Sequence, residues 1–208
     1  FAYAFYLRFE PIQRYAQVLY VKLQQCSQDG CPHSKKVSLA KKIIDHDPEF
    51  SLEYTWLGDL REEEGDMNSA FHFHEQAVLL NPKNVSSLFK LGRYYYNNRS
   101  LDLALRFLKH SSTIQGSSDV NYYMGRVYEK IGNYKKANWH YLRSYQYKVD
   151  NHWALARMAA MAYVMGDDVS AESYILMLRN KGQEDLANSL EEYTQLESYQ
   201  EFRPHDDE

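Results

Sequence analysis

Two cysteines near the start of the chain are the first residues whose type and spacing point to chemistry. Cys26 and Cys31 enclose the four residues Ser-Gln-Asp-Gly. This spacing would close a small disulfide loop in an oxidising compartment, whereas a reducing compartment would leave two free thiols. Two cysteines alone do not decide between the two states. His33 and His46 follow at intervals that match zinc ligand patterns poorly, so we expect no metal centre.

The remaining titratable residues do not form a catalytic motif. His72 and His74 are two positions apart on an expected helix and point to different sides, so they cannot bind one ion together. The run from Glu62 to Glu64 is typical of a solvated helix face. We recognise no serine or cysteine nucleophile with a histidine partner, no glycine-rich phosphate loop and no metalloprotease motif. We therefore predict a protein that is not an enzyme and needs no cofactor.

Composition restricts the class of protein further. The chain of 208 residues has 24 basic and 28 acidic side chains, a formal net charge of −4, and 44% hydrophobic residues. A negative total charge makes general binding to nucleic acid unfavourable. The longest apolar run, Phe1 to Leu7, is far shorter than the roughly 20 residues of a membrane-spanning helix. We expect the chain as given to be soluble, in either a cytoplasmic or an extracytoplasmic compartment.

A repeat of 33 or 34 residues organises most of the sequence. Small residues recur at Gly58, Gly92, Gly125 and Ala159, and an alanine lies twelve residues after each of them. Three of the four units also have a glycine seven residues after the small residue, followed by Asp or Asn. Such a unit predicts a helix, a short turn and a second helix. One hairpin cannot bury its apolar faces alone, so the units must stack.

The repeated positions resemble the tetratricopeptide repeat. Its Leu-Gly-x2-Tyr…Ala-x3-aromatic-x2-Ala pattern is matched by Leu57-Gly58…Ala70-His74-Ala77, Leu91-Gly92-Tyr95…Ala104-Leu108-Ser111, Met124-Gly125-Tyr128…Ala137-Tyr141-Ser144 and Met158-Ala159…Ala171-Ile175-Leu178. The resemblance implies an all-α, right-handed superhelical solenoid of stacked antiparallel helix pairs.

The repeat also predicts the organisation of the chain. Residues 1–50 are expected to form an N-terminal helix and a divergent hairpin, and residues 203–208 a frayed acidic tail. The four regular repeats are predicted at 51–84, 85–117, 118–151 and 152–185, with a capping helix at 186–202.

Proteins of this family typically hold a peptide on the concave surface formed by the first helices. Carried over to this sequence, that surface would contain Phe89, Arg93, Tyr96, Asn97, Tyr122, Arg126, Trp153 and Tyr163. Arginine and aromatic side chains favour a partner segment with acidic and aromatic residues. Thr55 and Asp59 stand where the chaperone-binding branch of the family has a Lys/Asn pair, so the tails of Hsp70 and Hsp90 are not expected partners.

We therefore predict a non-catalytic scaffold or assembly factor that binds a protein or peptide in the concave groove. One alternative is the soluble domain of a larger membrane or envelope assembly, because Phe1–Leu7 and Arg8 resemble the end of an interfacial segment and attachment could lie upstream of Phe1. The other is an RNA-binding helical-repeat protein, because repeats 85–117 and 118–151 are net positive while the flanking repeats are net negative.

Overall fold

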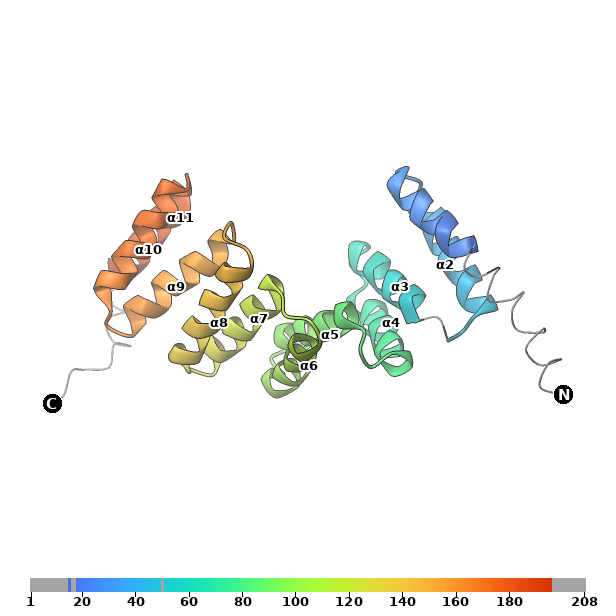
Figure 1. The fold of residues 1–208 in the computed structure, drawn as a ribbon, viewed down its shortest axis with the longest axis horizontal. Helices are drawn as coiled ribbons and strands as arrows, with labels where there is room; N and C mark the ends of the chain where they lie inside the picture. Colours follow the sequence, from blue (N-terminus) through green and yellow to red (C-terminus); the bar gives the residue numbers. More distant parts are fainter. Residues whose placement is uncertain (1–14, 16–17, 50, 196–208) are drawn as a thin grey trace. The chain divides into compact units, whose positions relative to one another are not determined.

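The computed structural model describes residues 15, 18–49 and 51–195, and the regular structure of these residues is entirely helical (Figure 1). A helical stretch over residues 18–28 precedes the labelled elements. The helices that follow are α2 (His33–His46), α3 (Ser51–Glu63), α4 (Met67–Leu80), α5 (Val85–Asn97), α6 (Leu101–Ile114), α7 (Ser118–Lys130), α8 (Tyr134–Tyr147), α9 (His152–Val164), α10 (Asp168–Asn180) and α11 (Glu184–Gln195). The prediction of an all-α array of helix pairs is confirmed.

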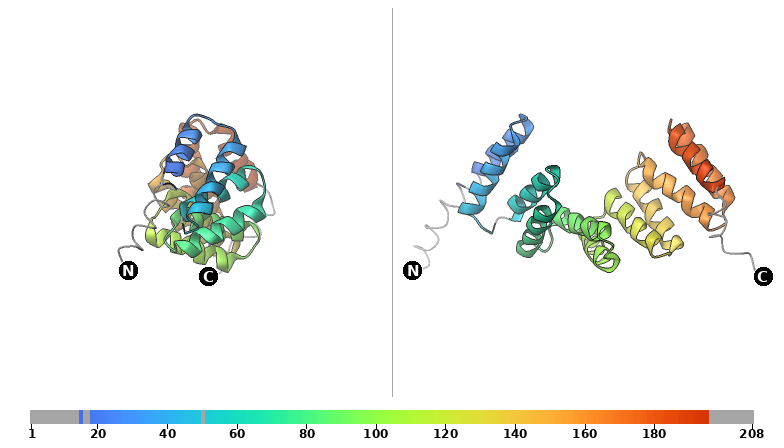
Figure 2. Two further views of the ribbon diagram at one scale, coloured as in Figure 1. Left: turned by 90° about the vertical axis from the view of Figure 1, so that its right-hand side faces the viewer. Right: turned by 180° about the vertical axis from the view of Figure 1, so that it is seen from behind.

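The chain divides into two compact units, Phe1–Tyr94 and Tyr95–Glu208, and the division falls within α5. In the first unit, α2 packs against α3, and α3 pairs with α4. In the second unit, α7 pairs with α8, α9 with α10, and α11 packs against both α9 and α10. Figure 2 shows the consecutive pairs from two further directions. Residues 1–14, 16–17 and 50 of the predicted N-terminal element 1–50 lie outside the described residues, as do residues 196–202 of the predicted capping helix and the predicted tail 203–208.

Glycine ends the first helix of each of three hairpins in a left-handed conformation. Gly65, Gly132 and Gly166 have φ values of 82°, 81° and 77°. Such values cost a residue with a Cβ about 1–2 kcal/mol, which explains the glycine at this step of the repeat. The next residue then caps the second helix, as Asn133 does by accepting a hydrogen bond from the Lys136 amide. Arg99 occupies the same step between α5 and α6 with φ 60°.

In two of the hairpins, the glycine of the first helix accommodates a ring from the second helix. A Cβ added at Gly58 would lie 2.6 Å from the His74 ring, and one added at Gly125 would lie 2.6 Å from the Tyr141 ring. His74 therefore fills the consensus aromatic position as a packing residue, as its place in the repeat predicted. Both rings are buried, so the close approach of the two helices depends on glycine at these steps.

An asparagine links successive hairpins at two places. The Nδ2 of Asn84 donates to the Ser51 Oγ at 3.1 Å, and the Nδ2 of Asn151 donates to the Ser118 Oγ at 3.0 Å. Each asparagine also accepts a hydrogen bond from a backbone amide in the first turn of the following helix. The same side chain thus satisfies a helix end and ties it to the preceding hairpin.

The apolar core of each unit follows the repeat. In the first unit, buried side chains from the helical stretch 18–28, α2 and α3 form one cluster, comprising Leu19, Leu23, Ala40, Ile43, Leu57 and Leu60. In the second unit, Ala187 of α11 is fully buried against Leu155 and Leu178, so α11 covers the end of the last hairpin. Burying each leucine contributes about 2 kcal/mol. Among the described residues, no helix combines the length and apolar character needed to cross a bilayer.

Candidate functional site

A cluster of charged side chains lies where α3, α4 and α5 meet in the first unit. The Lys90 ammonium lies 3.0 Å from the Asp59 Oδ1 and 2.7 Å from the Glu62 Oε2. Arg93 pairs with the other carboxylate oxygen of Glu62. These groups come from successive first helices, so the cluster is built at the step from one repeat to the next.

His74 forms the buried side of this cluster. Its Nδ1 lies 3.2 Å from the Ser87 Oγ, and its Nε2 faces the Asp59 Oδ1 at 3.9 Å, beyond hydrogen-bond distance. Burial lowers the pKa of His74 to about 4, against the opposing effect of the Asp59 charge, so the ring is neutral at pH 7. Asp59, Glu62 and His74 could supply three metal ligands, but the Lys90 ammonium already bridges the two carboxylates. We therefore assign no metal to this cluster.

The second unit contains an equivalent cluster displaced by 67 positions, two repeats further along. Asp59, Glu62, His74 and Lys90 correspond to Arg126, Glu129, Tyr141 and Arg157. Glu129 accepts hydrogen bonds from the Tyr141 hydroxyl and, at 3.0 Å, from the Arg157 Nη1. Burial raises the pKa of the Tyr141 hydroxyl, and the charge of Glu129 raises it further, so Tyr141 remains a hydrogen-bond donor.

Arg126 differs from the other arginines of these clusters because tyrosines, and no carboxylate, surround it. Its guanidinium carbon lies 5.4 Å from the centre of the Tyr96 ring and 5.9 Å from that of Tyr122. The Lys130 ammonium lies 4.2 Å from the centre of the same Tyr96 ring. None of the interactions found among the described residues gives Arg126 an acidic partner. This half-buried guanidinium is therefore available to an anionic group from another molecule.

An apolar hollow of about 200 Å³ lies beside this cluster, between α9 and α11. Its lining residues are Trp153, Ala156, Arg157, Ala160, Leu186, Ser189 and Leu190. On α5, two repeats earlier, the residues equivalent to Ala156 and Ala160 are Phe89 and Arg93. Replacing two large side chains by methyl groups leaves space on α9, and the tryptophan beside it is 65% exposed.

The predicted surface residues therefore fall into three groups. Tyr122 and Arg126 lie together on α7, and Trp153 lies at the hollow. Tyr96 and Tyr163 are 4% and 9% exposed, so they offer a partner little area. The other three lie on α5, where Arg93 pairs with Glu62, Phe89 is partly buried and Asn97 is exposed.

Sequence reasoning missed the contribution of Arg157, Leu186, Ser189 and Leu190. Three of these residues lie on α11, which the consensus of the repeat does not describe. Arg157 is one position beyond Ala156 and could have been found by aligning it with Lys90 across the 67-residue step.

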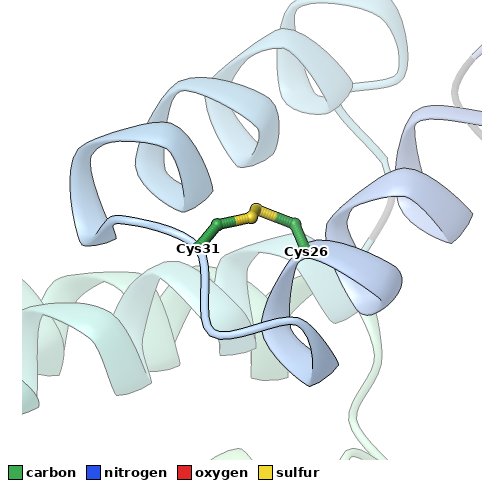
Figure 3. The surroundings of a disulfide bond; sticks show 2 residues. All are labelled: Cys26 and Cys31. Carbon is green, nitrogen blue, oxygen red and sulfur yellow. A yellow bond between two sulfur atoms is a disulfide. The ribbon is translucent and has the colours of Figure 1, made fainter.

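Cys26 and Cys31 are joined by a disulfide in the structure, with their Cα atoms 5.2 Å apart (Figure 3). The bond closes the turn between the helical stretch 18–28 and α2. Gly30 within this turn has φ 68°, a left-handed conformation that glycine adopts without strain. The loop therefore covalently joins the two helices of the least regular hairpin.

The chain was compared with protein families, curated proteins and solved structures. No protein-family model matches the chain, and no curated protein matches it in sequence. Solved structures do match. MamA from Desulfovibrio magneticus RS-1, residue 41 to the end, has a TM-score of 0.68 at 14% identity over 81% of this chain and 97% of that one.

A second MamA structure has a TM-score of 0.65 at 18% identity over 85% of this chain and 92% of that one. PilF of Pseudomonas aeruginosa has a TM-score of 0.63 at 18% identity, and covers 93% of this chain and 96% of its own. MamA and PilF are tetratricopeptide-repeat proteins. The helix pairs, the glycine steps and these likenesses together define the fold of this chain as a tetratricopeptide-repeat array.

Proposed function

We propose that this protein is a non-catalytic interaction scaffold that binds a segment of a partner protein on the first helices of its second unit. The observation that carries the proposal is the hollow between α9 and α11, flanked by an exposed tryptophan. Its apolar lining fits one large apolar side chain of a partner. Arg126, with tyrosine rings beside it and no carboxylate, supplies an anion-binding group on α7.

These two features specify the chemistry of the segment. A large aliphatic or aromatic side chain would fill the hollow, and a carboxylate would pair with Arg126. Trp153 adds rigid contact area with few rotatable bonds, as is common at binding hot spots. Tetratricopeptide-repeat proteins such as MamA and PilF support an interaction role at the level of the fold. The partner itself is a protein with an acidic and apolar segment.

A non-catalytic role agrees with the state of the polar clusters. Their carboxylates are engaged by Lys90, Arg93 and Arg157, and the hydroxyl of Tyr141 is committed to Glu129. Such engagement stabilises the step between repeats and leaves these groups poorly placed to exchange protons with a substrate.

A displayed peptide library selected against the full chain tests this function. We expect the selected peptides to share an acidic residue and a large apolar residue. Binding should weaken at least tenfold in the double variant Ala156→Phe/Ala160→Arg, which introduces the α5 residues and fills the hollow. Glu172→Phe, a substitution of similar bulk at an exposed site on α10, is the matched control and should bind normally. Equal binding by the filled and control variants would refute the proposed surface.

The disulfide favours a second possibility, that the chain is the soluble domain of an assembly in an oxidising compartment. Mass spectrometry of the protein isolated from its own cells, alkylated without reductant, tests it. Unmodified Cys26 and Cys31 would support that compartment, and alkylated thiols would exclude it.

A further inference from the structure

The outer face of α8 combines basic and aromatic side chains and contains no acidic residue. The exposed side chains of this helix that form the face are Lys135, Lys136, Trp139, Leu142, Arg143 and Tyr147. They follow one another at helical spacing, with Trp139 near the centre, and the sequence of α8 lacks both Asp and Glu. The whole helix therefore presents positive charge around an aromatic centre.

The cations of this face lack acidic partners. Arg143 lies over the ring of Trp139, with its guanidinium carbon 5.3 Å from the ring centre, and Lys136 lies 5.5 Å from the centre of the Tyr128 ring. Among the described residues, no carboxylate pairs with Lys135, Lys136 or Arg143. On the first helices, by contrast, Lys90 and Arg157 are held in ion pairs. The charge of α8 is thus available to an external anion.

The neighbouring helix α6 adds to the same field through Lys109, which is exposed. His140, on the buried side of α8, reports this field. Burial is the main cause that lowers its pKa to about 4, and the charges of Lys109, Arg143 and Lys136 lower it further. The charges of Lys136 and Arg143 on α8 and of Lys109 on α6 therefore act on the same buried ring.

Apolar groups lie among these charges. Trp139 is 53% exposed, Tyr147 51% and Leu142 38%. Tryptophan and tyrosine are enriched at membrane interfaces, where the ring lies at the level of the lipid headgroups. A helix that combines basic residues with Trp and Leu binds anionic bilayers through electrostatic attraction and shallow insertion. We propose that the outer face of α8 binds the surface of a bilayer containing anionic phospholipids.

Lipid accounts for this face better than nucleic acid does. A phosphate backbone would use the cations but has no apolar counterpart for the Leu142 side chain. The net charge of −4 also opposes a long polyanion, whereas a bilayer contacts only the local face. Each cation near an anionic bilayer surface strengthens binding about fivefold, so a few cations and one inserted ring give measurable affinity.

Co-sedimentation of the full chain with lipid vesicles tests the proposal. We expect binding to vesicles of phosphatidylcholine and phosphatidylserine in equal parts, weakening as salt rises, and none to pure phosphatidylcholine. The variant Lys136→Glu/Arg143→Glu should bind at least tenfold more weakly, and Trp139→Ala about fivefold more weakly. Circular dichroism establishes that each variant remains helical, so that a loss of binding reports on the face itself.

Lys41→Glu/Lys42→Glu on α2 is the matched control. It makes the same change in net charge at two exposed lysines of a helix that has no Trp, Tyr or Phe, so it should bind vesicles nearly as well as the parent chain. Ala156→Phe/Ala160→Arg should also bind vesicles normally, which separates this inference from the peptide-binding function. Equal losses in the α2 and α8 variants would overturn the proposal, as would binding to a single-stranded RNA oligonucleotide but not to vesicles.

Discussion

Hairpins α3–α4 and α7–α8 follow one plan and differ in charge at the step to the next repeat. In the first, two carboxylates, Asp59 and Glu62, surround the Lys90 ammonium. In the second, the guanidiniums of Arg126 and Arg157 accompany the single carboxylate of Glu129. Both arrangements sit on the same glycine step, so the backbone plan does not dictate the sign of the charge.

The two clusters also differ in how their charges are balanced and in how much surface their side chains cover. In the first cluster Arg93 completes the charge balance, and its long side chain occupies surface. Its equivalent in the second cluster is Ala160, which lines the hollow together with Arg157. The charges at this step are thus balanced in the first unit, whereas in the second unit Arg126 adds a cation for which no acidic partner is found among the described residues.

The largest effect on stability is expected when a buried acid of the first hairpin is replaced by the residue at the equivalent position of the second. Glu53 is fully buried, its oxygens lack hydrogen-bond partners, and burial raises its pKa to about 7. The equivalent residue in α7 is Val120. Between pH 4.5 and 7 the Glu53 carboxyl group keeps its proton in the folded state and loses it in the unfolded state. The free energy of unfolding therefore falls as pH rises through that range, and the full cost of the buried charge is reached above pH 7.

Glu53→Val should therefore stabilise the first unit by about 3 kcal/mol at pH 8, and much less at pH 4. Chemical denaturation at the two pH values measures the difference. Glu53→Gln is the control that removes the charge and keeps the shape, and it should recover part of the gain. A Val variant that is less stable than the parent chain at pH 8 would contradict the stated environment.

An intermediate effect is expected from exchanging the packing rings. The pKa of His74 is lowered in the folded state, so the unfolded chain takes up a proton first as pH falls. The stability that neutral His74 provides is present above pH 6.5 and is lost as pH falls toward 4. Asp59 and Lys90 face the ring and act in opposite directions on this pKa.

His74→Tyr introduces the residue of the second hairpin, whose hydroxyl can donate to Glu62 as Tyr141 donates to Glu129. The change in the free energy of unfolding caused by this variant should be about 2 kcal/mol more favourable at pH 5 than at pH 8. Thermal unfolding across pH 4 to 8 measures it. His140 retains its lowered pKa in the second unit, so some acid sensitivity should persist. An unchanged pH profile would show that His74 is not the sensitive group.

The smallest effect is expected at the turn that departs from the plan. Arg99 adopts φ 60° where Gly166 stands two repeats later, and the Ser100 side chain makes no capping hydrogen bond. Arg99→Gly should remove the backbone strain of the folded state, but the glycine also raises the conformational entropy of the unfolded chain. The expected net increase in the free energy of unfolding is therefore up to about 1 kcal/mol. Urea denaturation with Lys83→Gly as an exposed loop control measures it. A destabilised Arg99→Gly variant would indicate that the arginine side chain matters more than its backbone.

Much of the fold could be predicted because the repeat fixes local geometry. A small residue every 33 or 34 positions, with a large side chain sixteen positions later, specifies two helices in close contact. Burial of Tyr96 and Tyr163 could not be read in the same way. The helical period predicts on which side of its helix a residue lies. The exposed fraction of its side chain depends instead on the sizes of the neighbouring side chains on other helices.

The sequence by itself determined the hairpins, their order and the unusual step at Arg99, because these depend on residues close together in the chain. Only the tertiary structure decided that Arg126 lies among tyrosines without a carboxylate among the described residues, that Ala156 and Ala160 open a hollow closed by α11, and that Lys109 acts on the same buried histidine as the cations of α8. These features depend on side chains from different helices meeting in space, where packing and charge act over distances that spacing along the chain does not encode.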